Sequence, residues 1–155
     1  MKKILIMCLL SLSLMAAETN VFKASYKAPI DKVMQNIRDK FKADMLIIVW
    51  ELDILEEFKT RGLVQKLGAE YNKAGVTAVK TFVACNGMIG NSIINADADM
   101  MAYCPVRITL TEKDGVTSVL YVRPTSAPRD SKAYPALVKL ENKVVAAIQG
   151  SMEME

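Results

Sequence analysis

Alternation between apolar and polar positions predicts strands in several parts of the chain. Residues 21–27 and 106–111 place an apolar side chain at every second position, as half-buried strands do. The turn residues Lys113-Asp114-Gly115 follow the second of these segments, and residues 116–122 resume a strand pattern. This spacing is typical of a hairpin, so we expect the last two segments to pair with each other.

Two further strands are predicted from runs of apolar residues. Residues 76–84 form one of them, and residues 45–52, with the sequence MLIIVWEL, form the other. The second run is short, rich in branched side chains and almost without polar positions. We therefore interpret it as a buried strand that carries Trp50 into the core.

Helical periodicity fills the segments between the strands. An amphipathic helix is predicted after Pro29, which suits a first helical turn. Its predicted buried face consists of Ile30, Val33, Met34, Ile37 and Phe41. Residues 54–68 predict a second helix with a break at Gly62, and residues 131–149 predict a last helix.

The predicted order of elements, β-α-β-α-β-α-β-β-α, combines one hairpin with several crossovers. The strands mostly alternate rather than being apolar throughout, which favours a sheet with one covered face. We therefore predict an α+β fold, a two-layer sandwich with a mixed or mainly antiparallel sheet of about five strands and helices on one face. A doubly wound fold is the alternative. Residues 18–150 would form this single domain, and residues 151–155 a frayed tail.

The first residues have the features of a secretory signal peptide. Lys2 and Lys3 precede an apolar run over residues 4–15, which is too short to span a bilayer comfortably, and Ala16-Ala17 follows. We expect residues 1–17 to be the signal peptide, and the mature protein to be periplasmic or secreted. An uncleaved N-terminal anchor is the alternative.

The charge balance narrows the range of partners. Lys2 and Lys3 belong to the expected leader, so the mature chain would carry 18 basic and 17 acidic side chains and a net charge of +1. A nearly neutral chain without a basic run of five or more residues predicts no nucleic-acid partner. No later apolar segment reaches membrane-spanning length, so we expect no membrane partner after cleavage.

Most templates for an enzyme are absent from the sequence. The chain has no histidine, which excludes Ser-His-Asp and Cys-His sets, and its GMIG stretch lacks the spacing of a phosphate loop. We interpret the acidic residues at positions 51, 53, 56 and 57 as solvated charges where a strand ends and a helix begins. The sequence therefore favours a binding protein over an enzyme, and it leaves the cofactor unknown.

Two cysteines remain once cleavage of the expected leader has removed Cys8. Cys85 precedes Asn86, whose side chain can cap a short helix, so the sulfur would lie near a helix N-terminus that favours a thiolate. Cys104 lies at the entry of a strand, beside Pro105. Three roles stay open for Cys85: inert packing, a disulfide with Cys104, and a reactive or metal-binding thiol. An oxidising compartment would permit the disulfide.

Other side chains near the cysteines suggest that a metal ion or an anion could bind there. Thiolate and thioether groups together suit Cu(I), and such a metal site would draw on Cys85, Met88 and Cys104. The alternative is that Met88 packs against the sheet as an ordinary apolar residue. Arg107 could bind an anionic ligand near Cys104, or it could be an ordinary exposed charge.

The stretch FVACNGMIGNSIINADADMMAYCPVRITLTEKDG resembles the core of the domain of unknown function 302 (DUF302) family. Cys85 and Asn86 match a Cys-Asn turn at the end of a strand, Asp99 falls at an acidic step, and Cys104 matches a second cysteine. The likeness covers roughly residues 20–125. It implies a compact α+β domain that is often suspected to dimerise and has no assigned biochemical activity.

Together these observations predict a periplasmic, DUF302-like domain that binds a small molecule or a partner, with a homodimer among the candidates. Its candidate ligand-binding or redox residues are Cys85, Asn86, Cys104 and Arg107. The alternatives are a thiol-redox or sulfur-handling protein that uses Cys85 and Cys104, and a carrier of soft Cu(I).

Overall fold

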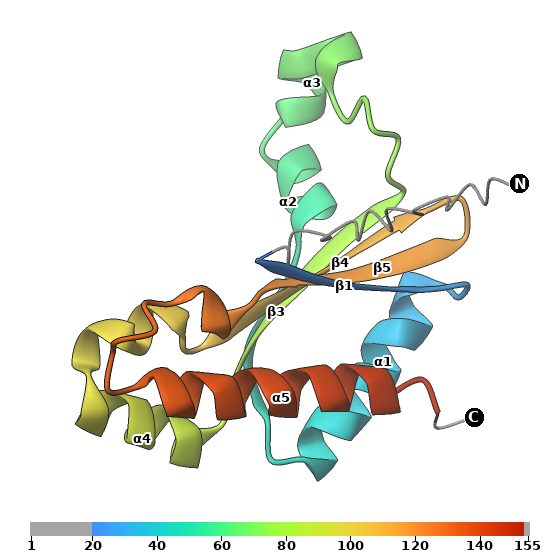
Figure 1. Ribbon diagram of the computed structural model, residues 1–155. Helices are drawn as coiled ribbons and strands as arrows, with labels where there is room; N and C mark the ends of the chain where they lie inside the picture. The colour runs from blue at the N-terminus through green and yellow to red at the C-terminus, as the bar shows by residue number, and fades with distance from the viewer. Residues whose placement is uncertain (1–19, 154–155) are drawn as a thin grey trace, which may run out of the picture.

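The computed structural model describes residues 20–153, which form one five-stranded sheet with helices packed on it (Figure 1). The strands are β1 (Val21–Tyr26), β2 (Ile47–Asp53), β3 (Ala78–Cys85), β4 (Val106–Lys113) and β5 (Val116–Val122). Their order across the sheet is β1-β5-β4-β3-β2, and every neighbouring pair is antiparallel. The predicted α+β class is confirmed, with a sheet that is antiparallel throughout the described chain.

The hairpin predicted at Lys113-Asp114-Gly115 joins β4 to β5. Asp114 and Gly115 both have positive φ angles, of 52° and 72°. A two-residue loop with both residues in this region matches the twist of the flanking strands, and Gly adopts it without strain. The turn chemistry therefore sets the register in which Lys113 faces Val116.

Three helices cover one face of the sheet, namely α1 (Ile30–Ala43), α4 (Gly87–Ala96) and α5 (Tyr134–Gly150). Two short helices, α2 (Ile54–Thr60) and α3 (Leu63–Leu67), form an arm that extends from the other side in Figure 1. The arm bends at Gly62, the predicted break, where φ is +72°. Short 3-10 turns complete the chain at Gly68–Glu70, Ala98–Tyr103 and Pro124–Ser126.

The core lies between the sheet and the three-helix layer. All five residues predicted for the buried face of α1 are buried. Phe41 of this helix meets Phe82 of β3 edge to face, with ring centroids 5.5 Å apart. Apolar side chains of β4 and α5, among them Ile108, Leu110 and Leu140, are fully buried beside them. Periodicity in the sequence therefore predicted the main packing interface correctly.

The interpretation of residues 45–52 as a buried strand is wrong. These residues contribute β2, which lies at the edge of the sheet and pairs only with β3 among the described strands. Ile47 is 62% exposed, Val49 59% and Trp50 52%, so the only tryptophan is not a core residue. Trp50 is opposite Val83 and lies outside the face that the helices cover. The prediction failed because the position of a strand in the sheet decides which of its side chains are buried.

The two ends of the chain relate differently to the predictions. The signal peptide expected at residues 1–17 lies outside the described residues. At the other end, the tail expected to fray from residue 151 begins as part of the fold, because Ser151 is fully buried and its hydroxyl donates to the Ile148 carbonyl at 2.7 Å. Within residues 20–153, no helix combines the length and the hydrophobicity that crossing a membrane requires.

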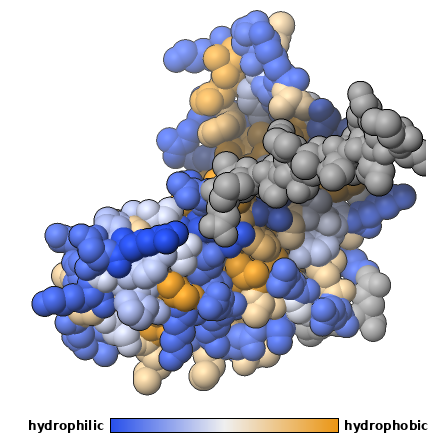
Figure 2. All heavy atoms as spheres, in the orientation of Figure 1, coloured by the Kyte–Doolittle hydropathy of each residue, from blue (hydrophilic) through white to orange (hydrophobic). Residues whose placement is uncertain are grey.

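The surface in the orientation of Figure 1 is largely hydrophilic, with apolar atoms on the arm formed by α2 and α3 (Figure 2). Phe58 and Leu67 of this arm are 38% and 44% exposed. Neither helix of the arm buries a residue completely. The arm therefore contributes little to the core, and the stability of the domain rests on the three-helix layer.

A buried carboxylate connects α5 to the end of β5. Glu141 is 7% exposed, and its two oxygens accept hydrogen bonds from the Arg123 guanidinium at 2.5 Å and from the Thr125 backbone and hydroxyl at 3.1 and 2.5 Å. The Arg123 guanidinium and the Thr125 N–H and hydroxyl thus make the burial of the Glu141 charge tolerable. The nearby Tyr121 hydroxyl is buried without a hydrogen-bond partner among the described residues, and burial raises its pKa, with Glu141 adding to the effect.

We predict that Glu141→Ala lowers the free energy of unfolding by about 2 kcal/mol, because it leaves the Arg123 and Thr125 donors without their acceptor. Asn142→Ala, at the exposed next position of the same helix, should change it by less than about 0.5 kcal/mol. Urea denaturation of the two variants measures the difference. Equal effects of the two substitutions would contradict a stabilising role for the Glu141 network.

Candidate functional site

The fold brings the two cysteines of the described chain together. Cys85 is the last residue of β3, and Cys104 lies just before β4. Their Sγ atoms are 3.4 Å apart, and both are free thiols. The contact follows from strand direction: β3 and β4 are antiparallel, with Ala84 opposite Val106, so the end of one strand lies beside the entry of the other.

The two thiols have different environments. Cys104 is 1% exposed, whereas Cys85 is half-buried. Burial raises the pKa of Cys104 from 9.0 to about 12, and the neighbouring Cys85 sulfur adds to the shift. Cys104 is therefore a neutral thiol at ordinary pH, and Cys85 is the sulfur that solutes can reach.

Asn86 organises the turn that follows Cys85. Its Oδ1 accepts from the Ile89 backbone N–H at 3.0 Å, which makes it the predicted cap of α4, and its Nδ2 donates to the Met45 carbonyl at 3.0 Å. The side chain is 5% exposed and spans from α4 to the residue that leads into β2. Both ends of the amide are thus committed to the fold rather than free for a ligand.

A glycine that sequence reasoning missed lies against both sulfurs. Gly90 is in the first turns of α4, and a Cβ built there would be 3.4 Å from the Cys85 Sγ and 3.6 Å from the Cys104 Sγ. An alanine would fit in ordinary contact, whereas a larger side chain would press on the pair. The spacing of Cys85 and Gly90 along the chain is the only signal that could have suggested this contact.

The other two predicted site residues, Met88 and Arg107, both have exposed side chains. The expectation that Met88 packs against the sheet is wrong, because its side chain is 82% exposed, while Ile89 is buried. Arg107 is exposed on β4 and lines a shallow hollow of about 320 Å³ with Tyr103, Pro105 and Val122. Across residues 20–153, no three His, Cys, Asp or Glu side chains gather in a way that could hold a metal ion.

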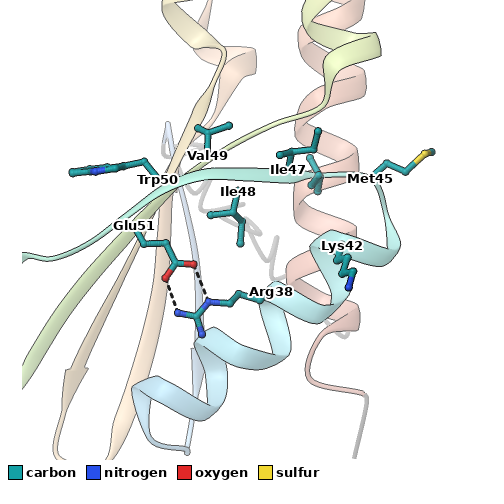
Figure 3. A pocket seen from close by; sticks show the side chains of 9 residues that line it. Arg38, Lys42, Met45, Ile47, Ile48, Val49, Trp50 and Glu51 are labelled. Carbon is teal, nitrogen blue, oxygen red and sulfur yellow. Dashed lines mark hydrogen bonds and ion pairs between the residues drawn. The ribbon is translucent and has the colours of Figure 1, made fainter.

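A second feature lies along β2, where Arg38 and Lys42 of α1 and residues 45–51 line an open hollow of about 500 Å³ (Figure 3). Figure 3 shows Ile48 and Glu51 on the α1 side of the strand, and Val49 and Trp50 on the other side. Sequence reasoning missed this surface because it placed the strand in the core.

An ion pair holds β2 against α1. The Arg38 guanidinium donates to both carboxylate oxygens of Glu51, with N–O distances of 2.8 and 2.6 Å. This contact lowers the pKa of Glu51 and raises that of Arg38, since each charge stabilises the other. Glu51 is therefore partnered, rather than being one of a group of free solvated acids.

We predict that alkaline pH destabilises the reduced protein partly through Cys104. Its pKa is higher in the folded state than in the unfolded state, so its contribution to stability is complete below about pH 9 and is lost as pH rises toward about 12. The slope from this one group is at most about 1.4 kcal/mol per pH unit. Cys104→Ala should therefore show a smaller decline of unfolding free energy above pH 9 than the parent.

The control for this prediction is Val106→Ala, which truncates a buried neighbour that does not titrate. It should lower stability at every pH and keep the parent's slope. Denaturant titrations under reducing conditions measure these slopes. Parallel curves for Cys104→Ala and Val106→Ala would contradict the assignment.

Comparison with known proteins places the chain among related folds. A search of the solved structures finds a similar chain in the crystal structure of an uncharacterized conserved protein DUF302 from Bacillus stearothermophilus, with a TM-score of 0.72 and 12% sequence identity. The match covers 84% of this chain and 97% of the other, and it shows a shared fold. Comparison with curated proteins found no match. The family model for the domain of unknown function DUF302 matches residues 22–153, and the chain belongs to this family.

Proposed function

We propose that this chain is an exported partner-binding domain, that it binds through the outer edge of β2, and that its partner is a second copy of the same chain. The observation that carries the proposal is the apolar, exposed edge strand. Export is inferred from the leader pattern of residues 1–17, and it makes the mature domain available to partners outside the cytoplasm.

The β2 edge has the composition of a contact surface. Ile47, Val49 and Trp50 are each more than half exposed, and Met45 just before the strand is 71% exposed. Natural edge strands are usually protected by Lys, Pro or covering segments, because free backbone groups and apolar side chains promote pairing with other chains. The strand sequence IIVWELD contains neither Lys nor Pro. A partner that covered this edge would remove these side chains from water.

The bulge in β2 influences how a partner would bind. The register with β3 shifts between Ile48 and Trp50, so Val49 is an extra residue without an opposite partner. Bulges twist a strand and redirect its side chains, which limits long continuous pairing along the free edge. We therefore infer a compact contact in which Ile47, Val49 and Trp50 supply most of the buried apolar surface.

The charges around β2 favour a second copy as the occupant. Lys42 lies where the strand begins, and no carboxylate among residues 20–153 is within ion-pair distance of it. Asp53 and Glu56 lie where the strand ends, at the start of α2. A twofold axis beside β2 would set the two strands antiparallel and bring Lys42 of each copy toward Asp53 and Glu56 of the other, whose carboxylates lie 3.9 Å from Lys80 and 3.3 Å from Lys59 of their own chain. Such self-complementarity is what a twofold contact requires.

We predict that Ile47→Lys weakens self-association by at least about tenfold, because a charged side chain would enter the apolar contact in place of Ile47. The matched control is Ile94→Lys, since Ile94 is also exposed, at 51%, but lies on α4 away from β2. Sedimentation velocity over a range of concentrations measures the dissociation constants. The control should associate as the parent does.

Two results would overturn this proposal. The parent chain could stay monomeric at the highest concentrations it reaches, in which case the edge binds another molecule or none. Alternatively, Ile47→Lys and Ile94→Lys could associate equally well, in which case the contact lies elsewhere. Circular dichroism and thermal unfolding establish first that both variants are folded.

A further inference from the structure

We propose that Cys85 and Cys104 form a redox-active dithiol, which a small disulfide such as glutathione disulfide converts to an intramolecular disulfide and which a small thiol restores. This proposal does not rest on the partner-binding edge proposed above, although Ile47 of that edge is the register partner of Cys85. It assigns a chemical role to the pair of free thiols in the described part of the chain.

The distance between the sulfurs carries the proposal. The Sγ atoms are in contact at 3.4 Å, and a disulfide requires about 2 Å, so small side-chain movements are enough to close the bond. Each cysteine is held by a different part of the sheet. Cys85 is fixed by the pairing of β3 with β2, and Cys104 by its place directly before β4. The fold therefore holds two thiols in a reactive arrangement that the unfolded chain would not maintain.

The small residues around the pair leave room for this movement. Gly90 presents no side chain toward the sulfurs, and even a Cβ there would only reach contact distance. Asn86 fixes the adjoining turn through its bonds to Ile89 and Met45, so closure does not depend on rearranging α4. The surroundings thus leave the two cysteine side chains room to approach each other.

The difference in burial sets the order of the chemical steps. Cys85 is the more accessible sulfur, and it loses its proton to solvent and attacks one sulfur of the small disulfide. The S–S bond of the reagent breaks, one thiol leaves, and a mixed disulfide forms on Cys85. Cys104 then attacks the Cys85 sulfur, the bond to the second glutathione sulfur breaks, and the Cys104 proton passes to that sulfur, so that the second thiol is released. Overall, the protein gives up two electrons and two protons, and the small disulfide is reduced to two thiols.

Inert packing and metal binding fit the same geometry less well. A purely packed thiol gains nothing from a second thiol in contact, and Cys85 is incompletely buried. A soft metal would find two sulfurs, with Met88 turned out to solvent and no third Cys, Asp or Glu grouped with the pair within residues 20–153. The expected export would also place the pair where small disulfides persist.

The test uses the full chain with Cys8→Ser, so that Cys85 and Cys104 are the remaining cysteines. The reduced protein is incubated with glutathione disulfide, alkylated and analysed by mass spectrometry. We expect loss of two hydrogens, no alkylation, and release of two glutathione molecules per chain. A reductant should restore two alkylatable thiols.

Single substitutions distinguish the two sulfurs. Cys104→Ser should accumulate a glutathione mixed disulfide on Cys85, because the second step is blocked. Cys85→Ser should form such an adduct at least about tenfold more slowly, because Cys104 is buried. In denaturant the two variants should react at similar rates, which shows that the native structure sets the difference.

A further measurement keeps the proposal testable if a serine variant fails to fold. Limited alkylation of the reduced Cys8→Ser protein, followed by peptide mapping, should label Cys85 before Cys104. The proposal is overturned if the folded protein keeps both thiols in glutathione disulfide while the denatured protein reacts. It is equally overturned if every disulfide formed joins two chains, or if Cys104 is labelled first.

Discussion

The antiparallel pairing of β3 with β4 is the constraint on which the other features depend. These two strands lie in the inner part of the sheet, and their register places Ala84 opposite Val106. The same register brings the end of β3 beside the entry of β4, which sets the two cysteine sulfurs 3.4 Å apart. On the other side of β3 lies β2, which forms an edge of the sheet within the described chain.

The cysteine pair and the exposed edge are neighbours in the structure. Ile47 at the start of β2 is the register partner of Cys85, and Asn86 connects the turn after Cys85 to the carbonyl of Met45. The Arg38–Glu51 ion pair holds the far part of the same strand against α1. Hydrogen bonds at one end and an ion pair at the other thus position β2, although its outer side chains gain little burial.

Sequence patterns predicted the elements well where the physics is local. The helical spacing of α1, the cap at Asn86, the break at Gly62 and the hairpin at Asp114-Gly115 all depend on residues within a few positions of one another. The strand predicted at residues 45–52 is present as β2, but its predicted burial was wrong for the opposite reason. An apolar run indicates a strand, but whether that strand is central or at an edge depends on pairings with distant segments.

The candidate site shows the same division. The sequence by itself determined that two cysteines follow the expected leader, that no histidine could activate them, and that Cys85 precedes a capped helix. Only the tertiary structure decided that the sulfurs touch, that Cys104 is buried while Cys85 is reachable, and that Gly90 faces both. The reason is physical: capping and periodicity are set by neighbours along the chain, whereas sulfur contact and burial are set by strand order and packing across the sheet.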